Sequence, residues 1–299
     1  MRISGAVNFT LHAKISIPAS VNGLALAPDG SQVAVTSFDK KLRAYATADM
    51  SLIKAVSLGT PFPHSVCYSP DGRSVASGGK SLTLFDTGSW KKGTSLKGHS
   101  HEIRASTFSP DGTRVYTASG NNVKPADWTA RAWDAATGVV LWKWKAQYTM
   151  SAVAASPDGK VVAVADSFGA VTLLDAATGL PRWTMELREP IYCLRFTPDS
   201  AKVLASGDLQ QLVIFSVADG KSRTIRLDTE ARGFALTSDG AAAIVGTNLG
   251  LTVVDVATGA VRARGPSVGR KPRALELSPD GTRLYLLASN PDELVVFDL

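Results

Sequence analysis

The sequence predicts an all-β fold in which seven similar units, each a four-stranded antiparallel sheet, form a single domain over residues 1–299. Three observations lead to this prediction: a tight-turn tripeptide that recurs seven times, a period near 40 residues, and an apolar strand pattern at the same place in every unit. The composition, 44% hydrophobic and 19% charged, is ordinary for a globular protein.

The tight turn has the sequence Pro-Asp-Gly or a close variant. Proline presets φ, aspartate can hydrogen-bond its own backbone, and glycine accepts a positive φ, so this tripeptide is typical of a hairpin turn. It occurs at residues 28–30, 70–72, 110–112, 157–159, 198–200, 238–240 and 279–281. Successive copies are 42, 40, 47, 41, 40 and 41 residues apart. Four strands in a period of this length are typical of a β-propeller, in which sheets pack face to face around a central channel.

The segment from residue 98 to residue 138 is the fullest copy of the unit. Its strand segments are rich in β-branched and aromatic residues that alternate with a period of two, as half-buried strands do. A second turn at residues 135–138 separates the last two of them. We expect the four strands at residues 104–109, 114–119, 129–134 and 139–144. In all seven units the third strand ends in an apolar residue, in order Tyr45, Phe85, Trp133, Leu174, Phe215, Val254 and Phe297.

The seventh unit has no fourth strand of its own, because the sequence ends at Leu299, two residues after Phe297. Residues 8–16 have the pattern of a strand and precede the first inner strand, which we expect at residues 21–27. We predict that residues 8–16 complete the last blade, which would seal the ring and cover a sheet edge with unpaired backbone groups.

Residues of the third unit resemble the WD-repeat signature, whereas the last unit, residues 268–290, is similar to the YVTN-type repeat of prokaryotic propellers. The resemblance implies a seven-bladed propeller. It also gives His99, Asp127 and Trp133 a structural role, in a hydrogen-bond relay that passes through a strand hydroxyl. The residues that match the WD signature are Gly98, His99, the turn at 108–112, Asp127, Trp133 and Asp134.

The sequence contains none of the catalytic or cofactor motifs that we considered. His99 and His101 lack a third ligand at a useful spacing for a metal, and motifs for covalent haem, phosphate loops and nucleophile elbows do not occur. We therefore expect a protein that is not an enzyme and that needs no metal or cofactor. Cys67 and Cys193 fall in different units, too far apart for a disulfide, so we expect free thiols.

One rim of a propeller carries the loops that enter each inner strand and the loops between second and third strands. These loops vary, so this rim is the expected binding surface. Positions four and six residues before the last apolar residue of each inner strand are ones that partners of WD-repeat proteins commonly contact. With residues from the other loops, they predict a partner-binding rim of Phe38, Phe62, His64, Glu102, Arg104, Trp128, Tyr192, Asp208, Glu230, Arg232, Lys271 and Arg273.

Trp128 has two interpretations, which the sequence leaves open. The third unit has an insertion at residues 121–127, and Trp128 follows it where other units have glycine. An exposed tryptophan there would be a good anchor for a partner. Alternatively, Trp128 folds over the insertion as a small local core.

The charge balance gives a hint about partners. The chain has 32 Lys and Arg against 26 Asp and Glu, a formal net charge of +6, and several of the basic residues fall on the predicted rim. An acidic protein surface or an anionic ligand would suit such a rim. Basic and aromatic residues do not alternate as in nucleic-acid grooves, which disfavours nucleic acid. No apolar run is long enough for a signal core or a membrane span, so we expect a cytoplasmic monomeric ring.

Two functions remain in competition at this point. The first is a non-enzymatic scaffold that binds partner proteins on the loop-bearing rim. The second is a small-ligand-binding, hydrolytic or oxidoreductase propeller, similar to lactonases or quinoproteins, that uses the mouth of the central channel.

Overall fold

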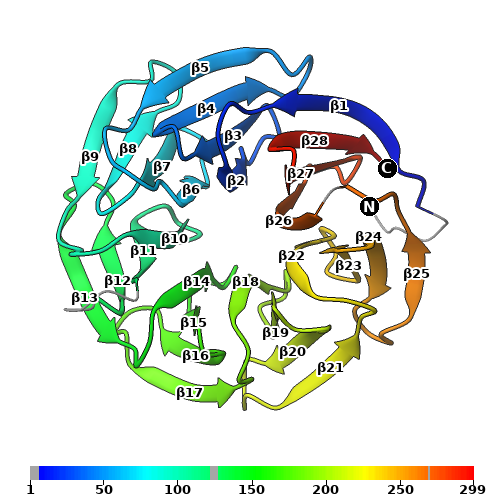
Figure 1. Ribbon diagram of the computed structural model, residues 1–299. Coiled ribbons are helices and arrows are strands. Elements are labelled where there is room, and N and C mark those ends of the chain that lie inside the picture. Colours follow the sequence, from blue (N-terminus) through cyan, green and yellow to red (C-terminus); the bar gives the residue numbers. More distant parts are fainter. Residues whose placement is uncertain (1–6, 122–126, 269) are drawn as a thin grey trace.

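The computed structural model describes residues 7–121, 127–268 and 270–299, with the side chains of residues 270, 271 and 273 also outside the description. Within these ranges the protein is all-β, with 28 strands and no α-helix. All strand pairs are antiparallel, and the sheets surround a central opening (Figure 1). In this part of the chain no helix is long and apolar enough to cross a membrane.

Most strands belong to four-stranded sheets formed by consecutive segments. The first contains β2 (Val21–Leu26), β3 (Gln32–Ser37), β4 (Lys41–Ala46) and β5 (Leu52–Ser57). The second contains β6 (Ser65–Tyr68), β7 (Ser74–Gly78), β8 (Leu82–Asp86) and β9 (Lys92–Leu96). The third contains β10 (Ile103–Phe108), β11 (Arg114–Ser119), β12 (Thr129–Asp134) and β13 (Val140–Lys145). The fourth contains β14 (Met150–Ala155), β15 (Val161–Asp166), β16 (Ala170–Asp175) and β17 (Pro181–Glu186).

The next two groups of four strands are joined into one eight-stranded sheet, because Gly207 pairs with Ala231. The fifth group contains β18 (Ile191–Phe196), β19 (Lys202–Gly207), β20 (Gln211–Ser216) and β21 (Ser222–Arg226). The sixth contains β22 (Ala231–Leu236), β23 (Ala242–Thr247), β24 (Gly250–Asp255) and β25 (Val261–Arg264).

The last sheet combines the two ends of the chain. It contains β26 (Arg270–Leu277), β27 (Arg283–Ser289), β28 (Glu293–Asp298) and the N-terminal strand β1 (Thr10–Ser16). β1 pairs with β28 from Thr10 opposite Asp298 to Ser16 opposite Glu293, and His12 Nδ1 lies 3.0 Å from Asp298 Oδ2. β1 and β28 lie side by side at the outside of this sheet (Figure 1).

The core is distributed between sheets, as expected for faces that pack on their neighbours. Seven clusters of buried apolar side chains occur in the described residues, and each contains residues of two adjacent sheets. One of them joins Val21 and Val35 of the first sheet to Tyr285 and Leu294 of the last. Inner strands also contact the next inner strand around the opening, and β26 contacts β2.

The repeated tight turn explains why the inner and second strands meet in the same way in each unit. In the third sheet Asp111 Oδ1 accepts hydrogen bonds from Ser109 Oγ at 2.5 Å and from Thr113 N at 3.0 Å, and Gly112 has a φ of 71°. These glycines also face a neighbouring turn. A Cβ on Gly72 would lie 3.7 Å from Pro28 Cδ, and one on Gly30 would lie 3.0 Å from Pro279 Cδ. The turns of the first and last sheets therefore meet in the same way as those of the first and second sheets.

Candidate functional site

The relay of the third sheet forms as the sequence predicts. Trp133 Nε1 donates to Thr117 Oγ1 at 2.8 Å, Thr117 Oγ1 lies 2.8 Å from His99 Nε2, and His99 Nδ1 lies 2.9 Å from Asp127 Oδ2. A neutral His99 that donates from Nδ1 and accepts at Nε2 satisfies every group of this chain. All members are buried, so the relay joins β11, β12 and the loop before β10 rather than facing a ligand.

Burial lowers the pKa of His99, and the hydrogen bond to Asp127 offsets only part of this effect. Burial alone would raise the pKa of Asp127. The hydrogen bonds from His99 and Thr129 outweigh burial, so the pKa of this carboxyl lies well below its ordinary value. A neutral histidine and an ionised aspartate are therefore the stable pair at neutral pH.

The inner strands share an irregularity at their loop-bearing ends, close to the mouth of the channel. Five inner strands have a β-bulge directly after their first paired residue, because one extra residue interrupts the register with the second strand. β26 has a longer irregularity at the same place, between Arg270 and Ala274. Bulges change the direction of a side chain and often occur next to functional sites. The extra residues are Asn22, Arg104, Ser151, Tyr192 and Arg232.

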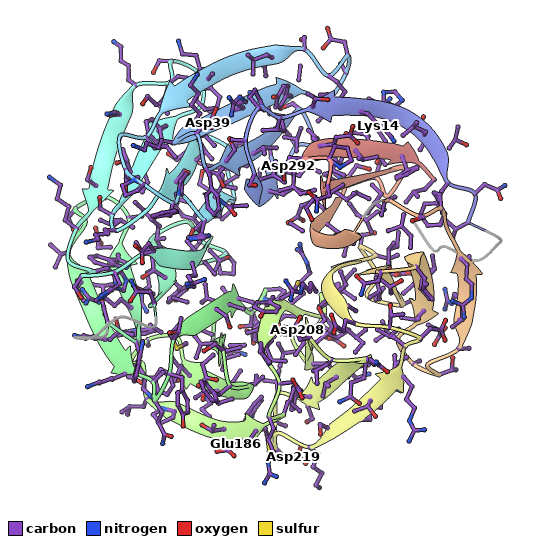
Figure 2. All side chains as sticks on the ribbon, in the orientation of Figure 1. Lys14, Asp39, Glu186, Asp208, Asp219 and Asp292 are labelled. Carbon is purple, nitrogen blue, oxygen red and sulfur yellow. The ribbon has the colours of Figure 1, made fainter. Side chains whose placement is uncertain are left out.

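Three predicted rim residues meet in one polar cluster. Arg232 Nε donates to Asp208 Oδ1 at 2.7 Å, Tyr192 Oη donates to Asp208 Oδ2 at 3.1 Å, and the Arg232 guanidinium carbon lies 5.0 Å from the centre of the Tyr192 ring. Burial and the Asp208 carboxylate raise the pKa of Tyr192. Asp208 lies near the centre of the ring, whereas Glu186 and Asp219 lie at its outer edge (Figure 2). The cluster is thus a preorganised pair of an aromatic ring and a guanidinium at the channel mouth.

Three further predicted residues form an aromatic cluster between the first two sheets. Phe38 makes edge-to-face contacts with Phe62, at 5.5 Å between ring centres, and with His64, at 5.6 Å. Phe38 and Phe62 are 38% and 50% exposed, and Phe62 has a φ of 54°, which is uncommon for a bulky residue. Such exposed, fixed rings are typical of contact surfaces.

Glu102, Arg104 and Trp128 lie around the start of the insertion. Glu102 Oε2 accepts from Asn121 Nδ2 at 3.0 Å, Arg104 Nε donates to the Gly120 carbonyl at 2.8 Å, and Trp128 Nε1 donates to the Asn121 carbonyl at 2.9 Å. Trp128 is half-buried against the core cluster of the third and fourth sheets. These contacts favour the interpretation of Trp128 as part of a small local core. Part of its side chain is still exposed to solvent.

The other predicted rim residues are less well defined. Glu230 is half-buried just before β22. Lys271 and Arg273 lie on β26, and their side chains fall outside the described part of the structure. Residues 122–126 of the insertion also lie outside it.

Two exposed aromatic residues on this rim were not predicted. Tyr148 and Phe168 stack with 4.0 Å between ring centres, and Trp128 lies 6.2 Å from Tyr148. Phe168 follows a serine in the loop between the second and third strands of its sheet, as Phe38 does. This shared Ser-Phe pair is the signal that could have identified Phe168.

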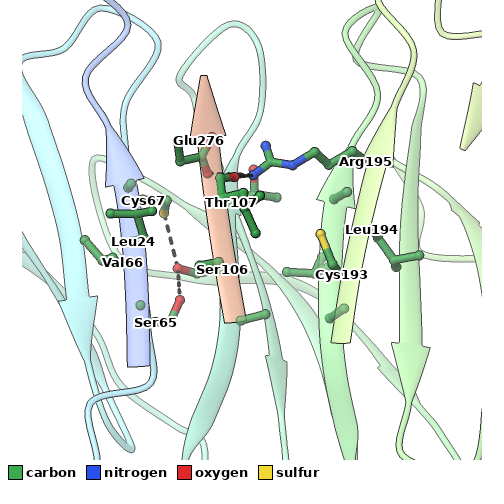
Figure 3. Close-up of a pocket in the computed structure, with 18 of the residues that line it drawn as sticks. Leu24, Ser65, Val66, Cys67, Ser106, Thr107, Cys193, Leu194, Arg195 and Glu276 are labelled. Atoms are coloured by element: carbon green, nitrogen blue, oxygen red, sulfur yellow. Dashed lines mark hydrogen bonds and ion pairs between the residues drawn. The ribbon is translucent and has the colours of Figure 1, made fainter. Parts of the chain in front are cut away.

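The central channel forms a cavity of about 690 Å³ whose walls come from the inner strands. Its ionisable lining residues include His64, Arg104, Arg195 and Glu276. Arg195 of β18 crosses to the last sheet, where Nη2 donates to Glu276 Oε1 at 2.7 Å and to the Leu275 carbonyl at 2.8 Å (Figure 3). This ion pair was not predicted, because its partners come from strands that are far apart in the sequence.

Both cysteines line the channel as free thiols, as the sequence predicts. Cys67 Sγ lies 3.2 Å from Ser106 Oγ, which in turn lies 2.5 Å from Ser65 Oγ (Figure 3). Burial raises the pKa of Cys67 to about 12 and also raises the pKa of Cys193, so both are protonated and weakly nucleophilic at neutral pH. Within the described residues, no group of three His, Cys, Asp or Glu side chains is arranged to hold a metal.

Antiparallel four-stranded sheets around a channel, with a buried Trp-Thr-His-Asp relay in one of them, define the class of WD-repeat β-propellers. Comparisons with known families agree. Residues 8–45 and 90–134 match the WD domain, G-beta repeat, and residues 126–291, more than half of the chain, match a model described as outer membrane protein assembly factor BamB. The chain therefore belongs to the family of this second model, and the shorter matches to the WD repeat agree with a WD-repeat β-propeller.

Similar curated proteins are much longer than the matched segments. Telomerase protein component 1 of Rattus norvegicus is 27% identical over 168 residues, which are 55% of this chain and 6% of that protein. Periodic tryptophan protein 2 of Arabidopsis thaliana is 24% identical over 242 residues, 71% of this chain and 25% of that protein. Meiotic recombination protein rec14 of Schizosaccharomyces pombe is 28% identical over 107 residues, 35% of each chain. The chain thus spans about a third or less of each relative.

Proposed function

We propose that this protein is a non-enzymatic scaffold, a closed seven-bladed ring whose loop-bearing rim binds partner proteins. The single observation behind this proposal is the set of bulged residues at the channel mouth, which includes Arg104, Tyr192 and Arg232 on three inner strands. Aromatic residues and arginine dominate the energetics of protein interfaces. The similarity to WD repeats supports an interaction role in general. A cytoplasmic location and a monomeric state are part of the proposal.

The test is affinity capture from the native host with matched charge reversals. The double variant Arg104→Glu, Arg232→Glu changes the rim, and the control Arg73→Glu, Lys221→Glu makes the same change of net charge at exposed residues of the tight-turn side. We expect proteins captured by the wild type to be lost from the rim variant and retained by the control. Equal retention by both variants would contradict the proposal.

Ring closure by the N-terminal strand can be tested separately. Removal of residues 1–16 deletes β1 and exposes the edge of β28. We expect a large fall in the midpoint of thermal unfolding, measured by circular dichroism, and a tendency to associate through the free edge, measured by light scattering. An unchanged midpoint would show that β1 does not close the ring.

A second candidate function is the binding of a small molecule in the channel. The observation that favours it is the cavity of about 690 Å³, which is within the usual size range of small-molecule sites. Native mass spectrometry of the protein purified from its host tests this. A bound mass that is displaced by the substitution Ala154→Phe in the channel wall would support it, and a spectrum of the bare chain would contradict it.

A further inference from the structure

We infer that a strip of the rim over the third and fourth sheets binds an extended peptide segment in which a large apolar residue and an acidic residue lie about three to five positions apart. The strip consists of Arg104, Trp128, Tyr148 and Phe168. This inference rests on the proposed function and specifies one site and one ligand chemistry within it.

The outer end of the strip is an exposed ring on a well-ordered turn. Phe168 is 60% exposed, yet its backbone N–H donates to Asp166 Oδ1 at 2.9 Å, and Ala170 N donates to the same oxygen at 3.0 Å. Asp166 itself is buried, and Leu187 N donates to the Gly169 carbonyl at 2.9 Å. The turn therefore presents an apolar ring to solvent in a fixed position, which reduces the conformational entropy lost when a partner binds.

The middle of the strip connects this ring to the protein core. Phe168 stacks on Tyr148 at 4.0 Å with an angle of 25° between the ring planes, and Tyr148 lies 6.2 Å from Trp128. Trp128 is fixed by its hydrogen bond to Asn121 and by the core cluster beneath it. Exposure increases along the row, from the half-buried Trp128 to Tyr148 at 38% and Phe168 at 60%. The apolar surface offered to a ligand is therefore at the Tyr148 and Phe168 end.

The inner end of the strip carries the positive charge of Arg104, which forms no ion pair within the described part of the chain. Arg104 is exposed and its Nε donates to the Gly120 carbonyl, but within the described residues it makes no ion pair. By contrast, Arg232 pairs with Asp208 and Arg195 pairs with Glu276. The guanidinium of Arg104 can therefore donate two hydrogen bonds to a carboxylate of a partner, in a bidentate pair.

The two ends belong to one surface. A Cβ on Gly120 would lie 3.0 Å from Trp128 Cδ1 and 3.1 Å from Thr149 Cα, so Gly120 packs closely against the aromatic row. The Gly120 carbonyl also accepts the hydrogen bond from Arg104, which places Arg104 next to this row. The distance from the centre of the Trp128 ring to the centre of the Phe168 ring is at most about 10 Å, which an extended peptide covers in about three residues. Arg104 is bound to Gly120, which touches both Trp128 and the backbone next to Tyr148, so we expect the acidic residue of the ligand to lie a few positions from the apolar one.

The geometry favours a peptide over single-stranded nucleic acid. Ring centres 4.0 Å apart leave no room for a base between Tyr148 and Phe168, although aromatic side chains that bind nucleic acid stack on successive bases. An acidic peptide needs only one cation, which Arg104 supplies.

The experiment begins with panning a phage-displayed library of random linear 12-residue peptides on the immobilised full chain. Enriched peptides are then titrated by fluorescence anisotropy against the wild type, Phe168→Ser, Arg104→Gln, Arg232→Gln and the control Leu249→Ser. Leu249 is 64% exposed in the corresponding loop of the sixth sheet, so this control removes a similar apolar side chain from the same rim.

We expect enriched peptides to contain an apolar and an acidic residue at the stated spacing. Their affinity should fall at least tenfold in Phe168→Ser and in Arg104→Gln and remain unchanged in Leu249→Ser. Circular dichroism spectra and unfolding midpoints should match the wild type, because both altered side chains are exposed.

Three outcomes would overturn the inference. They are no enrichment, affinity that is unchanged in Phe168→Ser and Arg104→Gln, or binding of a 12-nucleotide oligothymidylate that depends on the strip as strongly as the peptides do. Peptides whose binding depends on Arg232 but not on Phe168 would overturn the strip while leaving the rim scaffold intact. Capture of host proteins that is unaffected by the rim variant would overturn the scaffold itself.

Discussion

The two rims of this protein differ in how closely their units resemble one another. On the tight-turn rim, the aspartate of the turn accepts a hydrogen bond from the backbone N–H two residues further on in unit after unit, as Asp29, Asp111 and Asp199 show. On the loop-bearing rim, each unit differs, with aromatic clusters, an arginine that forms no ion pair within the described residues, and a Tyr-Asp-Arg cluster at separate places. Repetition thus identifies the residues that hold the sheets together, and departure from the repeat identifies the candidate binding residues.

The largest expected contrast is between two tryptophans of the third sheet. Trp133 is fully buried and belongs to the relay, whereas Trp128 is half-buried at the rim. We expect Trp133→Ala to lower the free energy of unfolding by about 3–5 kcal/mol and Trp128→Ala by less than half as much, measured by urea denaturation. Equal losses would mean that Trp128 serves mainly as core.

Replacement of a tight-turn glycine by valine should lower the free energy of unfolding somewhat less than Trp133→Ala does. Gly112 has a φ of 71°, where a β-branched residue is strained, so we expect Gly112→Val to destabilise the protein by about 2 kcal/mol. Gly88 is exposed in a turn between the third and fourth strands and is not among the glycines with positive φ. If Gly88→Val lost as much stability in the same measurement, backbone conformation would not be the cause.

The relay should make stability depend on pH below neutrality. Because burial lowers the pKa of His99 in the folded state, the unfolded state takes up a proton more readily near pH 6.5. The stability due to neutral His99 is therefore complete above about pH 6.5 and is lost as the pH falls. Between pH 6.5 and 5 we expect a loss of up to about 2 kcal/mol by urea denaturation. The variant His99→Gln should be less stable at neutral pH but should lack most of this slope.

The smallest effect on stability is expected at the binding strip. Phe168 is mostly exposed, so Phe168→Ser should change the free energy of unfolding by less than about 1 kcal/mol, although it should weaken peptide binding at least tenfold. Differential scanning fluorimetry can measure this change next to Leu249→Ser. A loss of stability as large as that of Gly112→Val would show that Phe168 has mainly a structural role.

The sequence predicted the repeated parts of the structure well for a physical reason. Tight turns and the relay around His99 depend on residues that are close in sequence or belong to a known pattern, and both form as expected. Counting along the inner strands also selected Arg104, Tyr192 and Arg232, which the structure shows to be bulged residues. The bulge itself was not predicted, because nothing in the composition of these strands indicates it.

Contacts between units could not be predicted from the sequence. The pair of Arg195 with Glu276 joins β18 to β26, and its residues are 81 positions apart, so their proximity depends on the curvature of the whole ring. The stack of Tyr148 on Phe168 joins two loops of the fourth sheet, and it depends on the conformations of both loops. The same holds for Tyr192, Asp208 and Arg232, which were selected one by one but not as a cluster.

The contact of Gly30 with Pro279 and the pairing of β1 with β28 make the junction between the first and last sheets similar to the other junctions. The closed ring proposed above therefore predicts that the fold does not depend on which sheet begins the chain. A circular permutant that begins at β14 and ends at β13, with residues 1 and 299 joined by a flexible linker, should fold to the same arrangement of sheets.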